Sequence, residues 1–360
     1  MNTEHSYITA EWLTEALRST NTISSDVSVS AIETSVISGG MMANSYLIKL
    51  EYANGTGSEP ASLVAKAPSS NPDSRKSGQE MDSYLKEVNF YKYIAPTLSM
   101  NVPKCYFAQI DPETSDFTLL LEDLNPATIC LPRDCSLEKL KASIIQLALL
   151  HADTWNDEKL KNYDWLVDSA APGHFERIKP MITKGWEVLK ASADDRVRSN
   201  FERVGDGFLA IAERWLGDMG KRFCLAHCDY RMTNVMYTED NESIAIDWQT
   251  LQLGRPGLDT FYLIANTLDP ETRKAHETEL LQVYYDTLLA NGVEDYSFDD
   301  CIEDYEYGSL YAVMMVLATT YGIGATHLPD AYKRQIFFVV PRYWGFVDEH
   351  EILQRYSSQA

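Results

Sequence analysis

The sequence is poor in basic residues. Its 360 residues include 31 Lys and Arg against 53 Asp and Glu, so the formal net charge is -22 at pH 7. Such a surface repels phosphates, and we expect no nucleic acid partner. An acidic surface would suit a cationic substrate, but net charge reports on solubility and association rather than on a site. We therefore interpret the charge as a contribution to general solubility.

Long apolar runs are also missing. No run approaches the roughly 20 residues that a membrane-spanning helix needs. The N-terminal stretch MNTEHSYITAEWLTEALRST has no basic region followed by a long apolar segment, so it does not resemble a secretory signal. It favours a short amphipathic helix with Thr9 as its cap. We expect a cytoplasmic protein with no membrane partner.

Paired cysteines and phosphate-loop glycines are absent as well. The six cysteines form no CxxC pair and no zinc-site spacing, which is typical of reduced thiols in the cytoplasm. Cys228 follows a histidine in the chain, but neighbours in sequence are not thereby paired in space, so we interpret it as a small apolar filler. No GxxxxGK[ST] motif occurs, which argues against a P-loop ATPase.

The front of the chain is rich in strand patterns. Residues 31–52 read as two strands around Gly39 and Gly40, and ASLVAKAP reads as a third strand that ends at Lys66. SSNPDSRKSG reads as a loop, and an apolar stripe predicts a helix over about 79–95 with Glu87 at its edge. VPKCYFAQI and FTLLLEDL then predict a hairpin.

The remainder is rich in helix patterns. Ser136 can cap a helix, residues 160–222 and 258–345 have mostly helical patterns, and a short hairpin is predicted around TEDNE. These patterns predict an α+β fold with a strand-rich domain over 1–124 and a helix-rich domain over 125–360.

The stretch LAHCDYRMTNVMY is the strongest chemical signal. Asp229 and Asn234 have four residues between them, and Asp247 follows the second strand of the predicted hairpin, which could fold it back beside Asn234. Phosphoryl transfer needs carboxylate and amide oxygens to hold Mg²⁺, and a further carboxylate to orient the attacking hydroxyl. Protein kinases arrange these groups as H-x-D-x-x-x-x-N followed by D-F-G, and here HCDYRMTN and DWQ occur in the same order.

Further pieces of a nucleotide site occur at the front of the chain. Gly39 and Gly40 lie where bare backbone could cover phosphates, and Lys66 could grip them with Glu87 as its partner. Glu122, Asp123 and Leu124 follow a strand where a kinase-type hinge would bind adenine. Each piece alone has a structural alternative: a turn, a solvated lysine, a surface glutamate, and turn residues after a strand. Their common order favours kinase chemistry.

HCDYRMTN, together with IDWQTLQLGRPGLDTFYLI, resembles the aminoglycoside/choline phosphotransferase superfamily. The DWQ form, the GxPxxD that follows, LLLEDL and the ExxFY of KEVNFYKYI resemble its ecdysteroid-kinase-like branch. The resemblance covers roughly residues 35–320. It implies a bilobal protein-kinase-like fold with a strand-rich N-lobe and a helical C-lobe, ATP and Mg²⁺ as cofactors, and a small-molecule alcohol as acceptor.

By this resemblance, Asp229 would be the catalytic base and Asn234 and Asp247 the metal ligands. Lys66 with Glu87 would clamp the phosphates. His227 would have a scaffolding role and Asp259 of GRPGLD would brace the catalytic loop. Cys228 replaces the glycine that the family usually has between His and Asp. A Cβ disfavours positive φ, so we expect the backbone of the loop to differ slightly.

The acceptor, the choice between ATP and GTP, and the oligomeric state stay open. The residues expected near the acceptor include many aromatics, most of which we interpret as core: Trp155, Trp165, Trp186, Trp215, Tyr284, Tyr285, Tyr305, Tyr307 and Tyr311. Aromatics in an acidic lobe could bind a quaternary amine or an aminosugar, whereas aromatics alone could bind an apolar alcohol, which the branch resemblance slightly favours. An antibiotic-inactivating phosphotransferase and a nucleotide-binding pseudokinase are the alternatives.

Overall fold

The computed structural model describes residues 7–39, 42–169, 171–193, 200–218, 220, 222–324 and 326–357. The chain divides into two units, which are described separately. Unit 1 comprises Met1–Thr128 and Ile244–Thr250, and unit 2 comprises Ile129–Ser243 and Leu251–Ala360. The short return of the chain to unit 1 places Asp247 in the same unit as Lys66 and Glu87.

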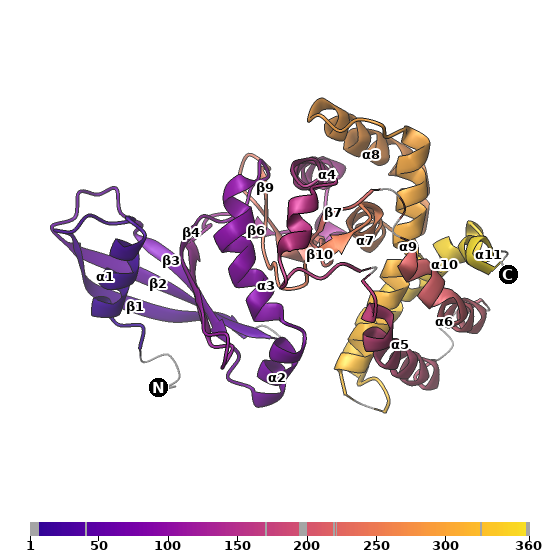
Figure 1. Cartoon of the computed structure of the whole chain (residues 1–360), viewed down its shortest axis with the longest axis horizontal. Helices are drawn as coiled ribbons and strands as arrows, with labels where there is room; N and C mark the ends of the chain where they lie inside the picture. The colour runs from indigo at the N-terminus through magenta and orange to yellow at the C-terminus, as the bar shows by residue number, and fades with distance from the viewer. Residues whose placement is uncertain are drawn as a thin grey trace. The chain divides into compact units, whose positions relative to one another are not determined.

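Unit 1 is built on a five-stranded antiparallel sheet of order β1-β2-β3-β5-β4 (Figure 1). Its strands are β1 (Ser28–Gly39), β2 (Ala43–Ala53), β3 (Ser62–Pro68), β4 (Cys105–Ile110) and β5 (Phe117–Glu122). Its helices are α1 (Ala10–Ser19), α2 (Pro72–Glu80) and α3 (Ser83–Asn89), and α3 continues as a π-helical turn (Phe90–Ile94) and a 3-10 turn (Ala95–Thr97). The three front strands and the β4–β5 hairpin confirm the prediction.

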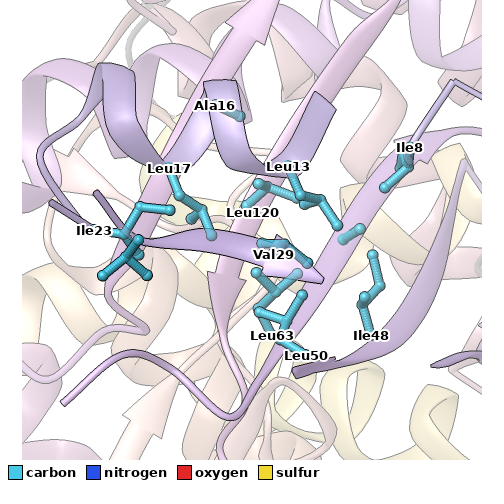
Figure 2. Packing of buried hydrophobic residues seen from close by; sticks show 12 residues of the cluster. Ile8, Leu13, Ala16, Leu17, Ile23, Val29, Ile48, Leu50, Leu63 and Leu120 are labelled. Carbon is cyan, nitrogen blue, oxygen red and sulfur yellow. The ribbon is translucent and has the colours of Figure 1, made fainter. Parts of the chain in front are cut away.

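The core of unit 1 lies between α1 and the sheet (Figure 2). Thr9 caps α1 by accepting a hydrogen bond from the Trp12 backbone N–H (3.2 Å), as predicted. Leu13 and Leu17 then pack on apolar strand residues that include Ala65. Because successive side chains of a strand point to opposite faces, Lys66 projects from the face opposite to the one that α1 covers.

One loop prediction and one helix boundary in unit 1 need correction. SSNPDSRKSG is not a loop, because Pro72–Glu80 forms α2. The Asn71 side chain accepts from the backbone N–H groups of Asp73 and Ser74, and Pro72 occupies the first turn, where a missing N–H costs nothing. The helix expected over 79–95 begins at Ser83, since Asp82 takes a left-handed conformation (φ 54°) that separates it from α2.

Unit 2 is mainly helical (Figure 1). Its helices are α4 (Leu137–Asp153), α5 (His174–Ala191), α6 (Phe201–Gly217), α7 (Gly257–Thr267), α8 (Pro270–Ala290), α9 (Phe298–Gly322), α10 (Asp330–Glu349) and α11 (Ile352–Ser357). Strand β7 (Cys224–Ala226) pairs antiparallel with β10 (Gln252–Gly254). The remaining short elements of unit 2 are β8 (Val235–Tyr237) and 3-10 turns over Pro132–Asp134, Glu158–Asn162 and Met232–Asn234. Strands β6 (Thr128–Ile129) and β9 (Ser243–Ala245) each have residues in both units.

Local signals explain where several of these elements begin and end. Ser136 caps α4 by accepting from the Lys139 backbone N–H (3.2 Å), as predicted. The turn predicted after β8 is closed by a hydrogen bond from the Thr238 N–H to the Glu242 carbonyl (3.0 Å). Most of the aromatics singled out in the sequence are buried core residues, with Trp155 and Tyr285 partly exposed. Among the described residues, no helix has the length and apolar character required to cross a bilayer.

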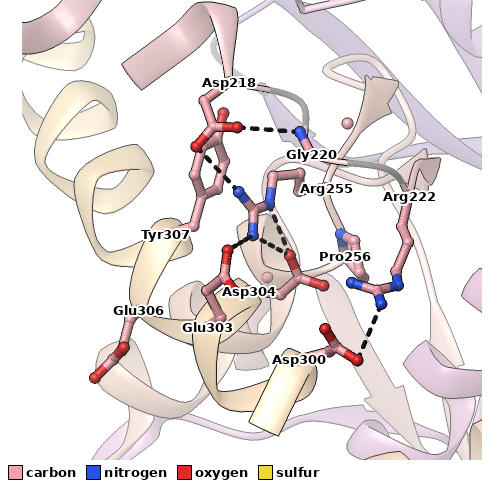
Figure 3. A network of polar contacts seen from close by, with 12 residues as sticks. Asp218, Gly220, Arg222, Arg255, Pro256, Asp300, Glu303, Asp304, Glu306 and Tyr307 are labelled. Atoms are coloured by element: carbon pink, nitrogen blue, oxygen red, sulfur yellow. Dashed lines mark hydrogen bonds and ion pairs between the residues drawn. The ribbon is translucent and has the colours of Figure 1, made fainter. Parts of the chain in front are cut away.

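The segment between β10 and α7 anchors the start of α7. Arg255 is 4% exposed, and its guanidinium binds the carboxylates of Asp304 (Nε to Oδ1, 2.7 Å), Glu303 (3.1 Å) and Asp218 (3.4 Å) (Figure 3). Two residues later, a Cβ on Gly257 would lie 1.5 Å from the Asp304 carbonyl oxygen. This position therefore requires glycine, which lets α7 approach α9 closely and places Asp259 in the first turn of α7.

Candidate active site

A buried ion-pair cluster in unit 1 joins three of the predicted residues. The Lys66 ammonium lies 2.5 Å from Glu87 Oε1 and 3.2 Å from Asp247 Oδ1. The side chains of Lys66 and Glu87 are 12% and 1% exposed, whereas Asp247 is 33% exposed. Burial alone would lower the pKa of Lys66, but the two carboxylates outweigh it and hold the pKa above its ordinary value. Lys66 is therefore a cation at neutral pH.

The local backbone explains how Asp247 reaches this cluster. Asp247 takes a left-handed conformation (φ 71°) two residues after β9 ends, and the Gln249 side-chain amide also donates to its Oδ1. The next residue, Trp248, is fully buried and stacks on Phe90 with ring centroids 3.8 Å apart. An apolar anchor thus holds the DWQ segment, while the carboxylate before it points to Lys66.

The predicted hinge residues make local contacts. Glu122 ends β5, and its carboxylate accepts from the Lys104 backbone N–H (3.1 Å). The Asp123 carboxylate accepts from the Ser62 hydroxyl (2.6 Å) and the Asn125 N–H (3.1 Å), and the Leu124 carbonyl accepts from the Ala127 N–H (2.8 Å). The two acidic side chains therefore act as turn residues.

Of the two adjacent glycines, only Gly39 lies within the described residues. Gly39 ends β1, where it pairs with Asn44 of β2. Gly40 lies outside the described residues.

A second cluster, in unit 2, contains Asp229 and Asn234. The Asn234 side-chain amide donates to the Asp229 carbonyl (2.9 Å) and to its Oδ2 (2.8 Å), so the last residue of the 3-10 turn is tied to the residue five positions before it. Arg231 Nε lies 3.0 Å from Asp229 Oδ1. Because the amide nitrogen of Asn234 faces Asp229, its carbonyl oxygen is directed away from that carboxylate.

Asp259 binds the backbone just ahead of Asp229. Its two carboxylate oxygens accept from the N–H groups of His227 (2.6 Å) and Cys228 (2.8 Å). Asp259 is fully buried, and His151 Nε2 lies 3.5 Å from its Oδ2. The His227 ring is also fully buried, and its Nδ1 accepts from the Asp229 backbone N–H (3.3 Å). These contacts fix the conformation of the residues that lead to Asp229.

Cys228 corrects our expectation about the loop. It adopts φ 66°, the left-handed region that a glycine would occupy, although it carries a Cβ. Asp259 holds its N–H, and the Tyr311 hydroxyl donates to its carbonyl (2.6 Å). The side chain is 2% exposed, consistent with an apolar filler. Fixing both peptide groups around Cys228 keeps this backbone conformation without a glycine.

Sequence reasoning missed several of these partners. Arg255 stands inside the quoted GRPGLD motif, and Arg231 inside HCDYRMTN, so both could have been singled out by position. Tyr311 was grouped only with the aromatics, because nothing in the sequence signals that its hydroxyl contacts a residue 83 positions away.

The donor types present suit a hard cation. The Asp247 carboxylate and the Asn234 side-chain amide each contain an oxygen of the kind that Mg²⁺ prefers. Within the described residues, no group of three or more His, Cys, Asp or Glu side chains is arranged to hold a metal ion.

Comparisons with known proteins agree with the family resemblance. The model of the ecdysteroid kinase-like family matches residues 39–293. The comparison with curated proteins found no match.

Solved structures share the fold at low identity. Choline kinase from Cryptosporidium parvum is 13% identical, with a TM-score of 0.59 over 91% of this chain and 93% of that one. The GDP complex of aminoglycoside 2'-phosphotransferase-IIIa is 12% identical, with a TM-score of 0.56 over 93% and 97%. A microcompartment-associated aminopropanol kinase is 13% identical, with a TM-score of 0.52 over 96% and 98%. The predicted α+β kinase-like fold is confirmed, and the family match over residues 39–293 shows that this chain belongs to the ecdysteroid kinase-like family.

Proposed function

We propose that this chain is an ATP-dependent kinase that transfers the γ-phosphoryl group to a hydroxyl of a small organic alcohol. The observation that carries the proposal is the buried Lys66, bonded to Glu87 and to Asp247, which is 181 positions away in the sequence. A kinase needs this lysine–glutamate pair and a metal-binding aspartate for phosphoryl transfer. A purely structural ion pair would not require the second, partly exposed carboxylate.

Different residues would bind the nucleotide, orient the acceptor and hold the metal ion. Lys66, positioned by Glu87, would bind the ATP phosphates, and backbone around Gly39, Gly40 and Glu122–Leu124 would contact the nucleotide. Asp229 would orient the acceptor hydroxyl and receive its proton, while His227 and Asp259 would hold the loop. Asp247 and the Asn234 amide oxygen would hold Mg²⁺, which supplies charge neutralisation when bound.

The contacts of Asp229 fit a base of this kind. The Asn234 amide donates a hydrogen bond to one of its oxygens, and Arg231 Nε lies 3.0 Å from the other oxygen as an ion-pair partner. An ionised carboxylate can accept a hydrogen bond from an alcohol and direct the oxygen lone pair at phosphorus. This orientation requires a fixed loop, which the contacts of Asp259 with the backbone support.

The decisive experiment measures ADP release with Mg-ATP, and separately with Mg-GTP, across a library of alcohols. The library includes aminoglycosides and macrolides, so that it also tests the antibiotic-inactivating alternative. We expect alcohol-dependent turnover that Asp229→Asn lowers at least about 1,000-fold, because a positioned base and its orienting role are both lost. Mg-ATP should still raise the melting temperature of this variant. Asp299→Asn, an exposed carboxylate of the same unit, is the matched control.

Two outcomes would contradict the proposal. Equal turnover by the wild type and Asp229→Asn would remove Asp229 from the mechanism. Stabilisation by Mg-ATP without turnover of any alcohol would favour the pseudokinase alternative.

A further inference from the structure

The carboxylate of Asp229 has a hydrogen-bonded amide at one oxygen and a guanidinium at ion-pair distance from the other. Asn234 Nδ2 lies 2.8 Å from Oδ2, and Arg231 Nε lies 3.0 Å from Oδ1. The Asn234 amide is buried, but the side chains of Arg231 and Asp229 are 33% and 19% exposed. A small molecule that hydrogen-bonds Asp229 from solvent therefore meets the guanidinium of Arg231 beside it.

The groups around this ion pair come from two further helices. Tyr262 of α7 is partly exposed, and burial together with the nearby Asp229 carboxylate raises the pKa of its hydroxyl. Its ring centroid lies 6.2 Å from that of Tyr343 of α10. The Tyr343 hydroxyl accepts from the Asn266 amide (3.0 Å). The charged groups that act on these two tyrosines are Asp229, Arg231 and, for Tyr343, also Arg342.

The charge at this place is locally balanced, unlike that of the whole chain. Arg231 pairs with Asp229, and Asp269 is among the charges that act on Arg342, whereas the net charge is -22. Carboxylates of unit 2 gather elsewhere, as in the cluster of Asp218, Glu303 and Asp304 around Arg255 (Figure 3). The overall acidic field is screened over about 8 Å at physiological salt, so the local arginine decides which charge can bind close to Asp229.

We propose that Arg231 determines acceptor specificity, in that its guanidinium excludes alcohols with an ammonium group near the hydroxyl and selects neutral or anionic, oxygen-bearing alcohols. This inference rests on the proposed kinase function and names the charge class of its acceptor. An ammonium group bound near the Asp229 carboxylate would meet a like charge within hydrogen-bonding distance of the same carboxylate. Guanidinium N–H groups donate only, so they pair with hydroxyl, carbonyl or carboxylate oxygens of an acceptor.

The test uses alcohols that differ in charge but not in shape. Choline and its neutral carbon isostere 3,3-dimethylbutan-1-ol form one pair, and the library is extended with further cationic, neutral and anionic triads on shared skeletons. The measured quantity is the ratio of kcat/KM between neutral and cationic members. We expect the wild type to prefer the neutral member at least about 10-fold, since like charges in contact are strongly unfavourable.

Four variants sharpen the assignment. Arg231→Gln should bring the ratio close to one, Arg231→Glu should invert it in favour of the cation, and Arg231→Lys should retain most of the preference. The matched control is Arg222→Gln, which removes an arginine of similar exposure that pairs with Asp300 (2.9 Å). The control should keep the wild-type ratio. A role of Arg231 confined to folding would lower all rates together and leave the ratio unchanged.

The outcomes separate this inference from the function on which it rests. A wild type that prefers cations, or an Arg231→Gln variant with the wild-type ratio, would overturn the specificity role while Asp229-dependent turnover still supports the kinase. If the wild type phosphorylates no alcohol of any charge, the proposed function fails and the inference falls with it.

Discussion

The two clusters of candidate residues are held by different forces. In unit 1, charged side chains from β3, α3 and the DWQ segment meet at Lys66, which two carboxylates neutralise. In unit 2, the residues before Asp229 are held mainly through their backbone, with Asp259 on two N–H groups and Tyr311 on a carbonyl. One cluster is an arrangement of charges, and the other is a fixed backbone conformation.

This difference suits two different tasks. A group that binds a highly charged ligand must be able to exchange protein partners for ligand partners, and a lysine between two carboxylates can do so. A group that orients a reacting hydroxyl must be in place before the ligand arrives, since a misplacement of about 1 Å can cost 100-fold in rate. Substitutions should therefore separate ligand affinity from loop geometry.

The largest effect is expected at the charge cluster. Lys66→Met leaves Glu87 buried without its cation, which should lower the free energy of unfolding by about 3–5 kcal/mol and weaken ATP binding. The double variant Lys66→Met/Glu87→Leu should regain much of the stability but none of the ATP affinity. Urea unfolding and calorimetric ATP titration measure the two quantities.

An exposed ion pair of the same sheet provides the control for this comparison. Lys49 and Glu33 are 61% and 73% exposed, so Lys49→Met should change stability by no more than about 1 kcal/mol. ATP affinity that survives Lys66→Met would show that the cluster is only structural.

The next effect concerns the backbone clamp. Asp259→Ala leaves two buried N–H groups without acceptors, which should lower the free energy of unfolding by about 3 kcal/mol. Hydrogen exchange should rise in residues 224–235, and ATP binding should persist because Lys66 and its partners are untouched. Glu294→Ala, an exposed carboxylate of unit 2, serves as the control. If Asp259→Ala lost ATP binding as well as protection from hydrogen exchange in residues 224–235, the two clusters would not act independently.

A smaller effect is expected from the hydroxyl that holds Cys228. Tyr311→Phe removes the hydrogen bond to the Cys228 carbonyl, at a cost of about 1–2 kcal/mol. Alkylation of the buried Cys228 thiol, followed by mass spectrometry, should then become faster. Tyr285→Phe, which removes a hydrogen bond to another backbone carbonyl, should leave Cys228 protected. Equal alkylation of wild type and Tyr311→Phe would show that Asp259 alone holds this loop.

Local signals allowed much of the fold to be predicted. Alternation of apolar residues, the capping residues Thr9 and Ser136 and the polar turns all act over a few positions, so strands and helix starts could be read directly. Asn71-Pro72 was misread as a loop signal because the same residues also start helices: Asn71 caps α2, and Pro72 occupies its first turn. The polar sequence of α2 has no apolar stripe that would have separated these two meanings.

The candidate site could be predicted where the order and spacing of residues indicate a chemical role. It could not be predicted where contacts with residues distant in sequence determine the backbone conformation. Lys66, Glu87 and Asp247 were singled out by their order along the chain, and the structure brings their side chains together. Their roles in phosphoryl transfer remain predictions. The left-handed Cys228 could not be foreseen, because its conformation depends on Asp259 and Tyr311, which are 31 and 83 positions away.

The smallest expected effect is the pH dependence of the charge cluster between pH 6 and 9. The folded-state pKa of Lys66 lies above its ordinary value of about 10.4, because two carboxylates outweigh the effect of burial. A raised pKa contributes stability that is fully present below the unfolded-state pKa and is lost as the pH rises through the folded-state pKa. The stability difference between wild type and Lys66→Met/Glu87→Leu, in which no buried Glu87 is left to take up a proton, should therefore stay constant from pH 6 to 9 and shrink only above a pH of about 10.4. Urea midpoints across this range measure it, and a difference that changed between pH 6 and 9 would mean that a group other than Lys66 carries the effect.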